Sequence, residues 1–377
     1  RLMVLKRIGR TGTIISLPGG MSLLTKLSQA HCSVTYTITF TIALAFCLCI
    51  SFGFLWLPFI FIVCLALGAL ERSVVNKRLK SAAGRAVIIT GCSTGFGFRL
   101  ATRLANQGTY VFAGVRKEED GIKLKKGTLQ PEMMHPLILD VTNEEQILSA
   151  TVVVDETLSK KGMSLLALVN NAGYAEYAPV ESMSTKRVRN MFEVNVFGVI
   201  TMVQAFLPLL RKYYTKKPLN TRIINISSGA GRIALPSSGQ YCATKYALEA
   251  LSDSLRMELK PWNISVILVE PGRFETEFQN KAYKELVSDG FSALDDTTEA
   301  HYRTMINHKN EESAKMQRPP LANCVEIIED ALLDTRPLAR YLAGPDVQTG
   351  VPVLNALNRQ ESIVDFILGR SWRSLKR

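Results

Sequence analysis

The feature that most constrains the fold of this 377-residue chain is a glycine-rich loop, Thr90-Gly-Cys-Ser-Thr-Gly-Phe-Gly97. The apolar run before it, Arg85–Ile89, is rich in β-branched residues and predicts a buried parallel strand. Residues 98–108 have helical periodicity and end in a glycine, so they predict a helix. A strand, a glycine turn and a helix in this order are typical of a dinucleotide site, where the helix N-terminus binds the phosphates.

Each glycine of the loop has its own expected part. Gly91 allows the tight turn, Gly95 the close approach of the backbone to a pyrophosphate, and Gly97 the contact between helix and strand. The spacing Gly-x-x-x-Gly-x-Gly differs from the Gly-x-Gly-x-x-Gly of the common dinucleotide fingerprint. The residues that we expect to bind the cofactor here are Thr90, Gly91, Ser93, Thr94, Gly95, Phe96 and Gly97.

The end of the next predicted strand, residues 109–115, indicates which dinucleotide fits. An acidic side chain at that point accepts hydrogen bonds from the ribose 2′-hydroxyl of NAD, whereas an arginine accommodates the 2′-phosphate of NADP. Arg116 stands there, which favours NADP(H). Glu118, Glu119 and Asp120 follow directly, so NAD(H) stays possible if the turn after the strand presents one of these acidic residues to the ribose instead.

Four further apolar runs alternate with helical segments. They are residues 137–141, 167–173, 222–228 and 264–272. This alternation predicts an α/β fold, a Rossmann-type doubly wound parallel sheet that binds ligands beyond the carboxyl ends of its strands. Asp140 and Val141, at the end of the first of these runs, are expected to meet the adenine edge of the cofactor.

The candidate for acid–base chemistry is a pair of residues four apart on a predicted helix, Tyr241 and Lys245. Residues at i and i+4 share one helix face. An ammonium beside a phenol favours the phenolate and lowers the tyrosine pKa from its usual value of about 10. Such a tyrosine passes a proton to or from an alcohol oxygen near neutral pH. The alternative is an ordinary amphipathic pair.

The order of these motifs resembles the short-chain dehydrogenase/reductase family over roughly half the chain, from Ala83 to Phe278. Besides the glycine loop and the Tyr-x-x-x-Lys pair, the matching motifs are Asn-Asn-Ala-Gly at Asn170–Gly173, Asn195, Ser228 thirteen residues before the tyrosine, and Pro271-Gly272 followed by Thr276.

The resemblance implies a role for each matching residue. Tyr241 is the general acid/base, and Ser228 hydrogen-bonds the reacting oxygen of the substrate. Lys245 lowers the Tyr241 pKa and holds the nicotinamide ribose. Asn195 anchors a water that links Lys245 to solvent, and the neighbouring Ser227 is structural.

The resemblance also extends the expected cofactor site. The additional residues are Asn171, Ala172, Gly173, Tyr241, Lys245, Pro271, Gly272 and Thr276. Thr276 and the backbone after Pro271 orient the carboxamide of the nicotinamide. No metal site is expected.

An uncharged segment precedes the catalytic region. There is no Asp or Glu before Glu71 and no charged residue at all from Cys32 to Leu70. This stretch exceeds the ~20 residues that one membrane crossing needs, so residues 32–70 are expected to be a transmembrane segment. Gly53 and Pro58 lie mid-run, so one long helix and a hairpin both stay open. A buried soluble helix and a cleaved signal peptide, whose apolar core is shorter, are disfavoured.

The flanks of this segment leave its orientation open. Basic residues lie on both sides, and a hairpin would keep both sides cytoplasmic. A start at Met21 would leave only Lys26 before the segment and would favour a single helix. An endoplasmic reticulum membrane with a cytoplasmic enzyme is the first hypothesis. The basic, acid-free residues 1–30 also resemble a mitochondrial presequence, which makes a mitochondrial membrane the alternative.

Composition adds limits on partners. The net charge is +12, but no compact basic-aromatic motif points to nucleic acid, and basic flanks beside anionic lipid explain part of the charge. The seven cysteines form neither a disulfide framework nor a zinc motif. A homodimer or homotetramer is usual in the resembled family.

The expected domains follow from these observations. They are a basic N-terminal segment (1–31), the membrane segment (32–70), a basic linker (71–83), the catalytic domain (84–345) with a substrate-binding flap (273–320), and a basic amphipathic tail (346–377). Phe291 and Tyr302 are among the aromatic residues of the flap. They are expected either to form a hydrophobic pocket for a lipophilic alcohol or ketone, or to pack the flap onto the domain.

The uncharged segment, the complete set of catalytic residues and the tail after the last predicted strand together resemble the membrane-anchored hydroxysteroid and retinol dehydrogenases of this family. This resemblance implies an NADP(H)-dependent oxidoreductase that acts on a lipophilic steroid- or retinoid-type alcohol or its carbonyl at a membrane. Two alternatives stay open. One is an NAD-dependent enzyme like mitochondrial 3-hydroxybutyrate dehydrogenase, and the other is a membrane-tethered protein that binds cofactor without turnover. The substrate, the direction of the reaction and the oligomeric state do not follow from the sequence.

Overall fold

The structure is a computed structural model that describes residues 5–7, 13–15, 78–79, 81–213, 220–274, 291, 294–314 and 318–350. The chain divides into two compact units, residues 1–77 and 78–377. In the first unit, β1 (Leu5–Arg7) pairs with β2 (Thr13–Ile15) in antiparallel fashion. The predicted membrane segment, residues 32–70, lies outside the described residues, as does the tail from residue 351.

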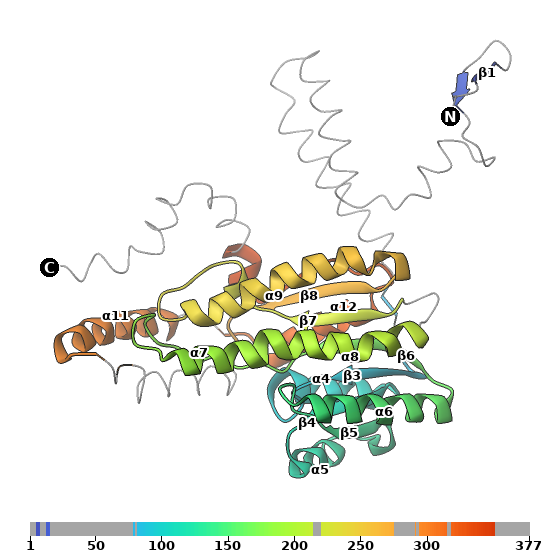
Figure 1. Ribbon diagram of the computed structural model, residues 1–377, viewed down its shortest axis with the longest axis horizontal. Coiled ribbons are helices and arrows are strands. Elements are labelled where there is room, and N and C mark those ends of the chain that lie inside the picture. The colour runs from blue at the N-terminus through green and yellow to red at the C-terminus, as the bar shows by residue number, and fades with distance from the viewer. Residues whose placement is uncertain are drawn as a thin grey trace. The chain divides into compact units, whose positions relative to one another are not determined.

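The second unit is built on a sheet of seven parallel strands in the order β5-β4-β3-β6-β7-β8-β9 (Figure 1). The strands are β3 (Arg85–Ile89), β4 (Tyr110–Val115), β5 (Met134–Ile138), β6 (Ser164–Asn170), β7 (Arg222–Ile226), β8 (Ser265–Pro271) and β9 (Arg340–Ala343). The order reverses between β3 and β6, which is the point where a doubly wound sheet binds its ligand. The predicted α/β fold is confirmed.

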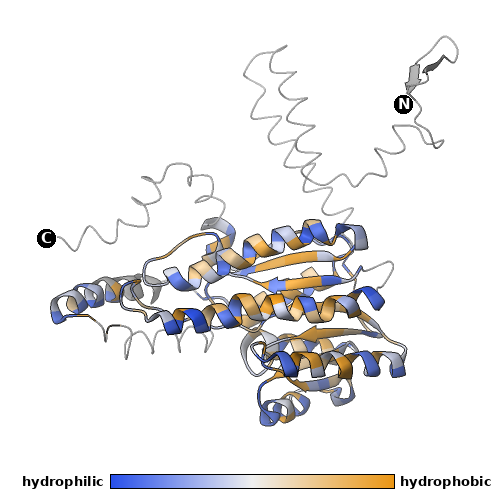
Figure 2. Ribbon diagram, viewed as in Figure 1, coloured by the Kyte–Doolittle hydropathy of each residue, from blue (hydrophilic) through white to orange (hydrophobic). Residues whose placement is uncertain are grey.

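Helices cover both faces of this sheet. They are α4 (Gly95–Asn106), α5 (Glu118–Lys126), α6 (Glu144–Lys161), α7 (Thr185–Phe192), α8 (Gly198–Lys212), α9 (Gly239–Glu258), α11 (Asp296–Ala314) and α12 (Leu321–Leu333). Short helical turns are η2 (Pro131–Met133), η3 (Glu193–Phe197), η4 (Gly229–Gly231) and η5 (Lys260–Trp262). The strands are apolar along their length and the helices are polar on their outer sides (Figure 2).

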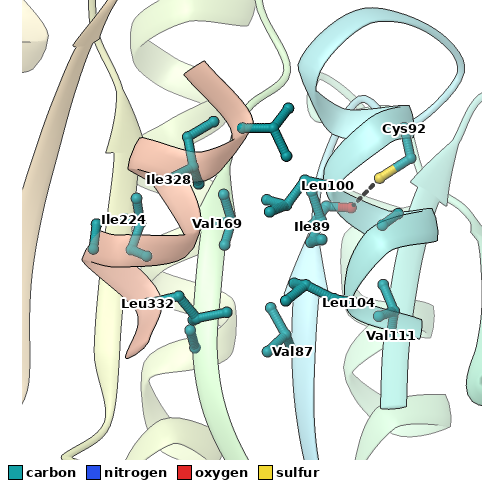
Figure 3. Close-up of a cluster of buried hydrophobic side chains, with 14 of the residues drawn as sticks. Val87, Ile89, Cys92, Leu100, Leu104, Val111, Val169, Ile224, Ile328 and Leu332 are labelled. Atoms are coloured by element: carbon teal, nitrogen blue, oxygen red, sulfur yellow. Dashed lines mark hydrogen bonds between the residues drawn. The ribbon is translucent and has the colours of Figure 1, made fainter. Parts of the chain in front are cut away.

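Two apolar clusters hold the layers together. In one of them, α4 and α12 lie side by side on the same face, with Leu100, Leu104, Ile328 and Leu332 packed against β3 and β6 (Figure 3). The other cluster packs α6, α8 and α9 onto the opposite face of the strands (Figure 1). Strands buried on both faces must be apolar throughout, which explains the unbroken hydrophobic runs in the sequence.

The first strand after α5 differs from the predicted one. The sequence predicted residues 137–141, but β5 is Met134–Ile138 and includes Pro136. A proline cannot donate a ladder hydrogen bond and is tolerated on an edge strand. Because β5 is the edge strand of the sheet, it can include Pro136, and so it begins earlier than the apolar run suggested.

A buried arginine ends helix α12. Arg222, at the start of β7, is fully buried, and its Nη1 donates hydrogen bonds to the carbonyls of Ala331, Leu332 and Asp334 at 2.8–3.1 Å. The last carbonyls of a helix have no partner within the helix. The guanidinium therefore caps α12 and ties it to the amino edge of the sheet.

One helical run of the domain resembles a membrane-spanning helix in its length and apolar composition. Among the described residues, a single run, Thr185–Lys212, is long and apolar enough to cross a membrane, and 44% of its most apolar part is buried. Met202, Phe206 and Leu210 of this run pack in the core against the sheet. Its apolar character is therefore accounted for by burial inside the domain.

Candidate active site

The glycine loop and the turn after β6 meet at the point where the strand order reverses. Thr90 is buried, and its hydroxyl accepts hydrogen bonds from the N–H groups of Asn171 (3.0 Å) and Ala172 (2.9 Å). The Asn171 amide donates in return to the carbonyls of Thr90 (2.8 Å) and Gly91 (3.0 Å). Thr90 and Asn171 therefore shape the cofactor site by fixing two loops to each other.

The three loop glycines are required for different reasons. Gly91 has φ +68°, and a Cβ there would stand 2.8 Å from the Cα of Ala172. A Cβ on Gly97 would stand 2.4 Å from the carbonyl oxygen of Gly91. Gly95 has φ +63°, but a Cβ there would meet no atom of the described residues within 4 Å. Gly91 and Gly97 thus keep the loop compact, while Gly95 presents bare backbone to open space.

The start of α4 suits an anionic group. Thr94 is the N-cap, but its side chain makes no capping hydrogen bond, and the first turn carries no acidic residue. The N–H groups of this turn and the helix dipole favour a phosphate. Ser93 directly precedes the N-cap, and Phe96 packs edge-on against Phe274 with ring centroids 5.5 Å apart. These residues fit the pyrophosphate of a dinucleotide.

Arg116 lies at the position that distinguishes the two dinucleotides. It follows the last residue of β4 and is exposed. Glu118, Glu119 and Asp120 form the first turn of α5, where negative charge is favoured by the helix dipole. The acidic residues therefore belong to the helix start, and Arg116 is the charged side chain at the strand end.

Asp140 lies two residues beyond the end of β5, half-buried. Its carboxylate accepts hydrogen bonds from the Thr142 N–H (2.9 Å) and hydroxyl (2.7 Å). Val141 is buried and packs against Gly198, where a Cβ would stand 2.8 Å from the valine Cγ2. Both residues follow the carboxyl end of β5, where their side chains stabilise the turn, and their contact with the adenine of the cofactor stays a prediction.

Helix α9 carries the predicted acid–base pair. Tyr241 and Lys245 are both buried on one face of the helix, with the lysine Nζ 5.8 Å from the centroid of the tyrosine ring. The Nζ donates to the carbonyl of Ile226 at 2.9 Å. A Cβ on Gly173 would stand 3.8 Å from the same Nζ. The pair thus lies between the ends of β6 and β7.

Ser228 is brought next to this pair by the end of β7. Its hydroxyl donates to the carbonyl of Pro271 at 3.4 Å and accepts from the N–H of Ala230 at 3.1 Å. A hydrogen bond also joins it to the Tyr241 side chain. Two hydroxyl groups therefore converge on one point at the carboxyl edge.

Asn195 lies in η3, a π-helical turn between α7 and α8. It is buried; its amide donates to the Tyr174 carbonyl (2.8 Å) and the Thr244 hydroxyl (3.1 Å), and its oxygen accepts from the Tyr174 N–H (3.0 Å). The Thr244 hydroxyl donates in turn to the Tyr241 carbonyl at 2.8 Å. Asn195 therefore connects the loop after β6 to helix α9. The sequence predicted a helix here but not the π-turn, which is a frequent feature of functional sites.

The predicted lowering of the Tyr241 pKa is wrong for this structure. Burial raises the pKa of Tyr241 above its usual value of 10, and the hydrogen bond with Ser228 only partly opposes that rise. The prediction considered charge alone, whereas removing a phenolate from water disfavours the ionised form. The Tyr241 phenol is therefore protonated at neutral pH in this structure.

Burial acts on Lys245 in the opposite direction. It lowers the pKa of the ammonium to about 8, against the attraction of Glu249, which raises the pKa. A value near 8 means that small electrostatic changes decide how much of Lys245 is charged near neutral pH.

The turn after β8 is held by a residue that the sequence analysis did not single out. Asp346 accepts from the Arg273 N–H at 2.9 Å, and its other oxygen stands 2.0 Å from the place of a Cβ on Gly272. Gly272 is thus required because the carboxylate lies directly against it. Pro271 belongs to the end of β8, and Thr276 lies outside the described residues.

An apolar cluster surrounds Tyr241. It includes Ala175, Ala178, Met183, Met191, Phe291 and Ile306, with Tyr174, Tyr177, Leu294 and Tyr302 packed against it. The rings of Tyr177 and Tyr241 meet edge-on with centroids 6.2 Å apart. Phe291 and Tyr302 of the predicted flap are therefore packed in the catalytic region.

The charges beside this cluster are paired. Arg187 forms an ion pair with the half-buried Glu176, and Arg303 forms one with Glu299. Arg303 also stacks over Phe291, with its guanidinium carbon 4.8 Å from the ring centroid. These arginines are thus neutralised by glutamates of the chain.

Comparisons with known proteins agree with this geometry. The family model for short chain dehydrogenase matches residues 85–286. The mitochondrial D-beta-hydroxybutyrate dehydrogenase of Rattus norvegicus is 37% identical over 205 residues, 54% of this chain and 58% of the relative. The match therefore spans little more than half the length of that relative.

Two further relatives match over more of their length. The 17-beta-hydroxysteroid dehydrogenase type 6 of Bos taurus is 35% identical over 76% of this chain and 88% of the relative. Retinol dehydrogenase 7 of Rattus norvegicus is 35% identical over 70% of this chain and 81% of the relative. A solved short chain dehydrogenase from Burkholderia cenocepacia, in complex with NADP, has a similar fold, with a TM-score of 0.56 and 24% identity over 76% of this chain and 98% of that one.

Proposed function

The chain belongs to the short-chain dehydrogenase family, and from this premise we propose that it is an NADP(H)-dependent oxidoreductase for a lipophilic alcohol of steroid or retinoid type and its ketone or aldehyde. The observation that carries the choice of substrate is the apolar cluster packed around Tyr241. A buried phenol in apolar surroundings, with hydroxyl groups only at its tip, suits a large apolar substrate with one oxygen.

The proton chemistry is assigned to Tyr241 and Ser228. The Tyr241 phenol donates a proton to the carbonyl oxygen during reduction and accepts one from the alcohol during oxidation. Ser228 holds the same oxygen by a hydrogen bond and stabilises the charge that develops on it. The bound nicotinamide supplies the hydride donor or acceptor.

Lys245 and Asn195 are assigned to support this step. The Lys245 ammonium opposes the burial of a developing phenolate on Tyr241 and binds the nicotinamide ribose hydroxyls. Asn195 holds the loop after β6 at Tyr174 and holds helix α9 through Thr244. It is therefore placed to keep the two sides of the site in register and to anchor a water on the path from Lys245 to solvent.

The choice of NADP(H) rests on Arg116. Its exposed guanidinium at the end of β4 is suited to bidentate binding of a 2′-phosphate. The three acidic residues after it are in the first turn of α5, so they do not take the place of a ribose-binding carboxylate at the strand end.

The relation to hydroxybutyrate dehydrogenases supports a second candidate, a small hydroxy acid with NAD(H). A small carboxylate substrate needs an unpaired cation in its site. Among the described residues beside the apolar cluster, Arg187 and Arg303 are paired with Glu176 and Glu299. The pairing favours the neutral lipophilic substrate.

The membrane setting is part of the same proposal. Residues 32–70 are an anchor in the endoplasmic reticulum membrane, and a mitochondrial membrane is the alternative. The basic end of the tail, residues 363–377, contributes contact with lipid. A lipophilic substrate then reaches the site from the bilayer, and the enzyme works as a dimer or tetramer.

The proposal is tested with detergent-solubilised full-length protein. Steroid and retinoid alcohols and ketones, and 3-hydroxybutyrate, are offered with NADPH and NADH or their oxidised forms, and the absorbance of reduced nicotinamide is followed. We expect turnover of a lipophilic substrate with the phosphorylated cofactor.

The matched control is Tyr241→Phe, which removes one oxygen and keeps the ring in its cluster. The variant should lose at least about 10²-fold in kcat, as expected for a general acid/base, and should bind NADPH like the wild type. Turnover of 3-hydroxybutyrate with NADH alone would establish the second candidate. Cofactor binding without turnover of any substrate would support a non-catalytic protein.

A further inference from the structure

The turn that follows β9 contacts two strand ends of the site. Asp346 lies against Gly272, in the turn after β8. Val347 is buried, and its Cγ1 stands 2.5 Å from the place of a Cβ on Gly229, the residue that directly follows Ser228. One short segment of the chain is therefore packed against the backbone at the ends of both β7 and β8.

The Asp346 carboxylate holds the backbone of the turn after β8. Its Oδ2 accepts a hydrogen bond from the Arg273 N–H at 2.9 Å, while the Gly272 N–H donates to the carbonyl of Ala343, the last residue of β9, at 2.7 Å. Two successive N–H groups of the turn are therefore bonded to β9 and to the segment after it. A hydrogen bond to an ionised acceptor is stronger than one to a neutral acceptor, so the carboxylate is the stronger of these two holds.

The position of Asp346 is fixed by its own turn. The Gln348 N–H donates to the Gly344 carbonyl at 3.0 Å, and the Gln348 side chain donates to the Leu342 carbonyl at 3.1 Å. The second carboxylate oxygen of Asp346, Oδ1, is buried and accepts no hydrogen bond from the described residues. Removing the carboxylate would therefore release the Arg273 N–H without breaking a wider network of the described side chains.

The turn held in this way is connected to the site at both of its ends. At one end, the Pro271 carbonyl accepts a hydrogen bond from the Ser228 hydroxyl at 3.4 Å, and Ser228 is hydrogen-bonded to Tyr241. At the other end, Phe274 is buried and packs edge-on against Phe96 of the glycine loop, with ring centroids 5.5 Å apart. A shift of the turn would therefore change both the direction of the Ser228 hydroxyl and the backbone beside the glycine loop.

We propose that Asp346 is a positioning residue for hydride transfer. Its carboxylate fixes the turn of residues 271–274, and with it the Pro271 carbonyl that directs the Ser228 hydroxyl and the backbone that binds the nicotinamide carboxamide. This inference rests on the function proposed above. A misplacement of about 1 Å can slow a reaction by about 10²-fold, so Asp346 acts on the chemical step without touching the reacting atoms. Binding of the 2′-phosphate at Arg116 does not depend on it.

The test is Asp346→Ala in the full-length protein. The rate constant of hydride transfer is measured in a single turnover, from the absorbance of enzyme-bound NADPH after mixing with a lipophilic ketone or aldehyde that the wild type reduces. We expect this rate constant to fall by about 10- to 10²-fold, whereas the KM of the carbonyl substrate should change by less than about 3-fold. A single-turnover rate constant does not depend on the fraction of active protein, so a merely structural role would not lower it.

Cofactor binding is titrated in the absence of substrate. The NADPH dissociation constant of Asp346→Ala should rise by about 2- to 10-fold, the effect of losing one ordinary hydrogen bond, because the turn no longer holds the nicotinamide. The dissociation constant of 2′,5′-ADP, which keeps the 2′-phosphate but lacks the nicotinamide, should stay the same. The matched control is Thr349→Ala, whose lost hydroxyl donates to the Pro345 carbonyl at 2.7 Å within the same turn. It should change neither binding nor the rate constant.

Asp346→Asn keeps the shape of the side chain and guards against misfolding of the alanine variant. Its neutral oxygen is a weaker acceptor for the Arg273 N–H, so its rate constant should lie between those of the wild type and Asp346→Ala. An unchanged rate constant in Asp346→Ala, or in Asp346→Asn if only that variant folds, would overturn the inference. Equal losses of NADPH and 2′,5′-ADP affinity would do the same. A wild type that reduces no ketone or aldehyde would instead refute the proposed function, while the two titrations would still decide whether Asp346 fixes the nicotinamide end of the site.

Discussion

The proposed preference for NADP(H) rests on a single side chain, Arg116, which is exposed at the end of β4 while its acidic neighbours begin α5. Arg116→Glu should weaken NADPH binding at least about 10-fold, since a charged hydrogen bond contributes about 1.5–3 kcal/mol. It should leave NADH binding unchanged or tighter. Lys126→Glu, with the same change of charge in the last turn of α5, is the control. Equal losses of NADPH and NADH affinity would contradict this assignment.

Glu270 makes stability depend on pH in an unusual direction. Burial raises the pKa of this carboxyl from 4.5 to about 7. Between these two pH values the folded protein keeps a proton on Glu270 that the unfolded chain has lost. The contribution of this proton to the free energy of unfolding is therefore complete below pH 4.5 and is lost as the pH rises through 7. Glu270→Gln, which is neutral at all pH values, should remove this loss.

Thermal or urea unfolding at pH 5 and pH 8 measures this effect. On going from pH 5 to pH 8, the free energy of unfolding of the variant should rise relative to that of the wild type by up to about 3 kcal/mol. A difference between variant and wild type that is the same at pH 5 and pH 8 would show that Glu270 does not titrate in this range.

At the residue scale, the sequence predicted the positions of the residues that belong to short motifs. Tyr241, Lys245, Ser228 and Asn195 come together as expected, because their spacing fixes their places on helices and strand ends. Asp346 was not predicted as part of the site, because nothing in its local sequence indicates that β9 brings it onto Gly272. The direction of the Tyr241 pKa was missed for a related reason, since burial is a property of the packed domain.

At the scale of the elements, the stability of helix α12 depends on Arg222, a residue that is distant from it in the sequence. Arg222→Met keeps much of the side-chain volume but leaves the carbonyls of Ala331, Leu332 and Asp334 without their donor. The free energy of unfolding should fall by about 2–4 kcal/mol, the cost of several buried unpaired acceptors. Denaturation of Arg222→Met and of the exposed control Arg211→Met checks this. A loss below about 1 kcal/mol would mean that water replaces the guanidinium.

The elements themselves were largely predictable, because buried parallel strands are marked by apolar runs and their helices by glycine stops. The position of β5 was missed by a few residues because edge strands accept proline, and the π-turn η3 was missed because its sequence continues the helical period.

At the scale of the molecule, the catalytic unit begins at Arg78. This residue pairs with Glu329 (2.9 Å), which is buried, and with Asp330 (3.0 Å), both on α12. A fragment of residues 78–377 should therefore fold and bind NADPH, whereas a fragment of residues 81–377 leaves Glu329 with less positive charge. The shorter fragment should melt about 2–4 °C lower.

The two fragments differ by three residues, so each is the control for the other in thermal unfolding followed by circular dichroism. Equal midpoints would show that Arg78 adds nothing to stability. Failure of both fragments to fold would show that residues 1–77 belong to the folding unit.

The catalytic residues lie at one end of the parallel strands, and this decides where a label can be attached to the chain. Leu79 is bonded to Leu333 beside the Arg222 cap, at the edge where the strands begin, whereas Asp346 and Val347 lie against Gly272 and Gly229, where the strands end and the chemistry is placed. A reporter or affinity handle joined ahead of Arg78 is therefore attached at the edge remote from the reacting groups. One inserted just after β9 would press directly on them. Labelling strategies for this enzyme should begin from the amino-terminal side.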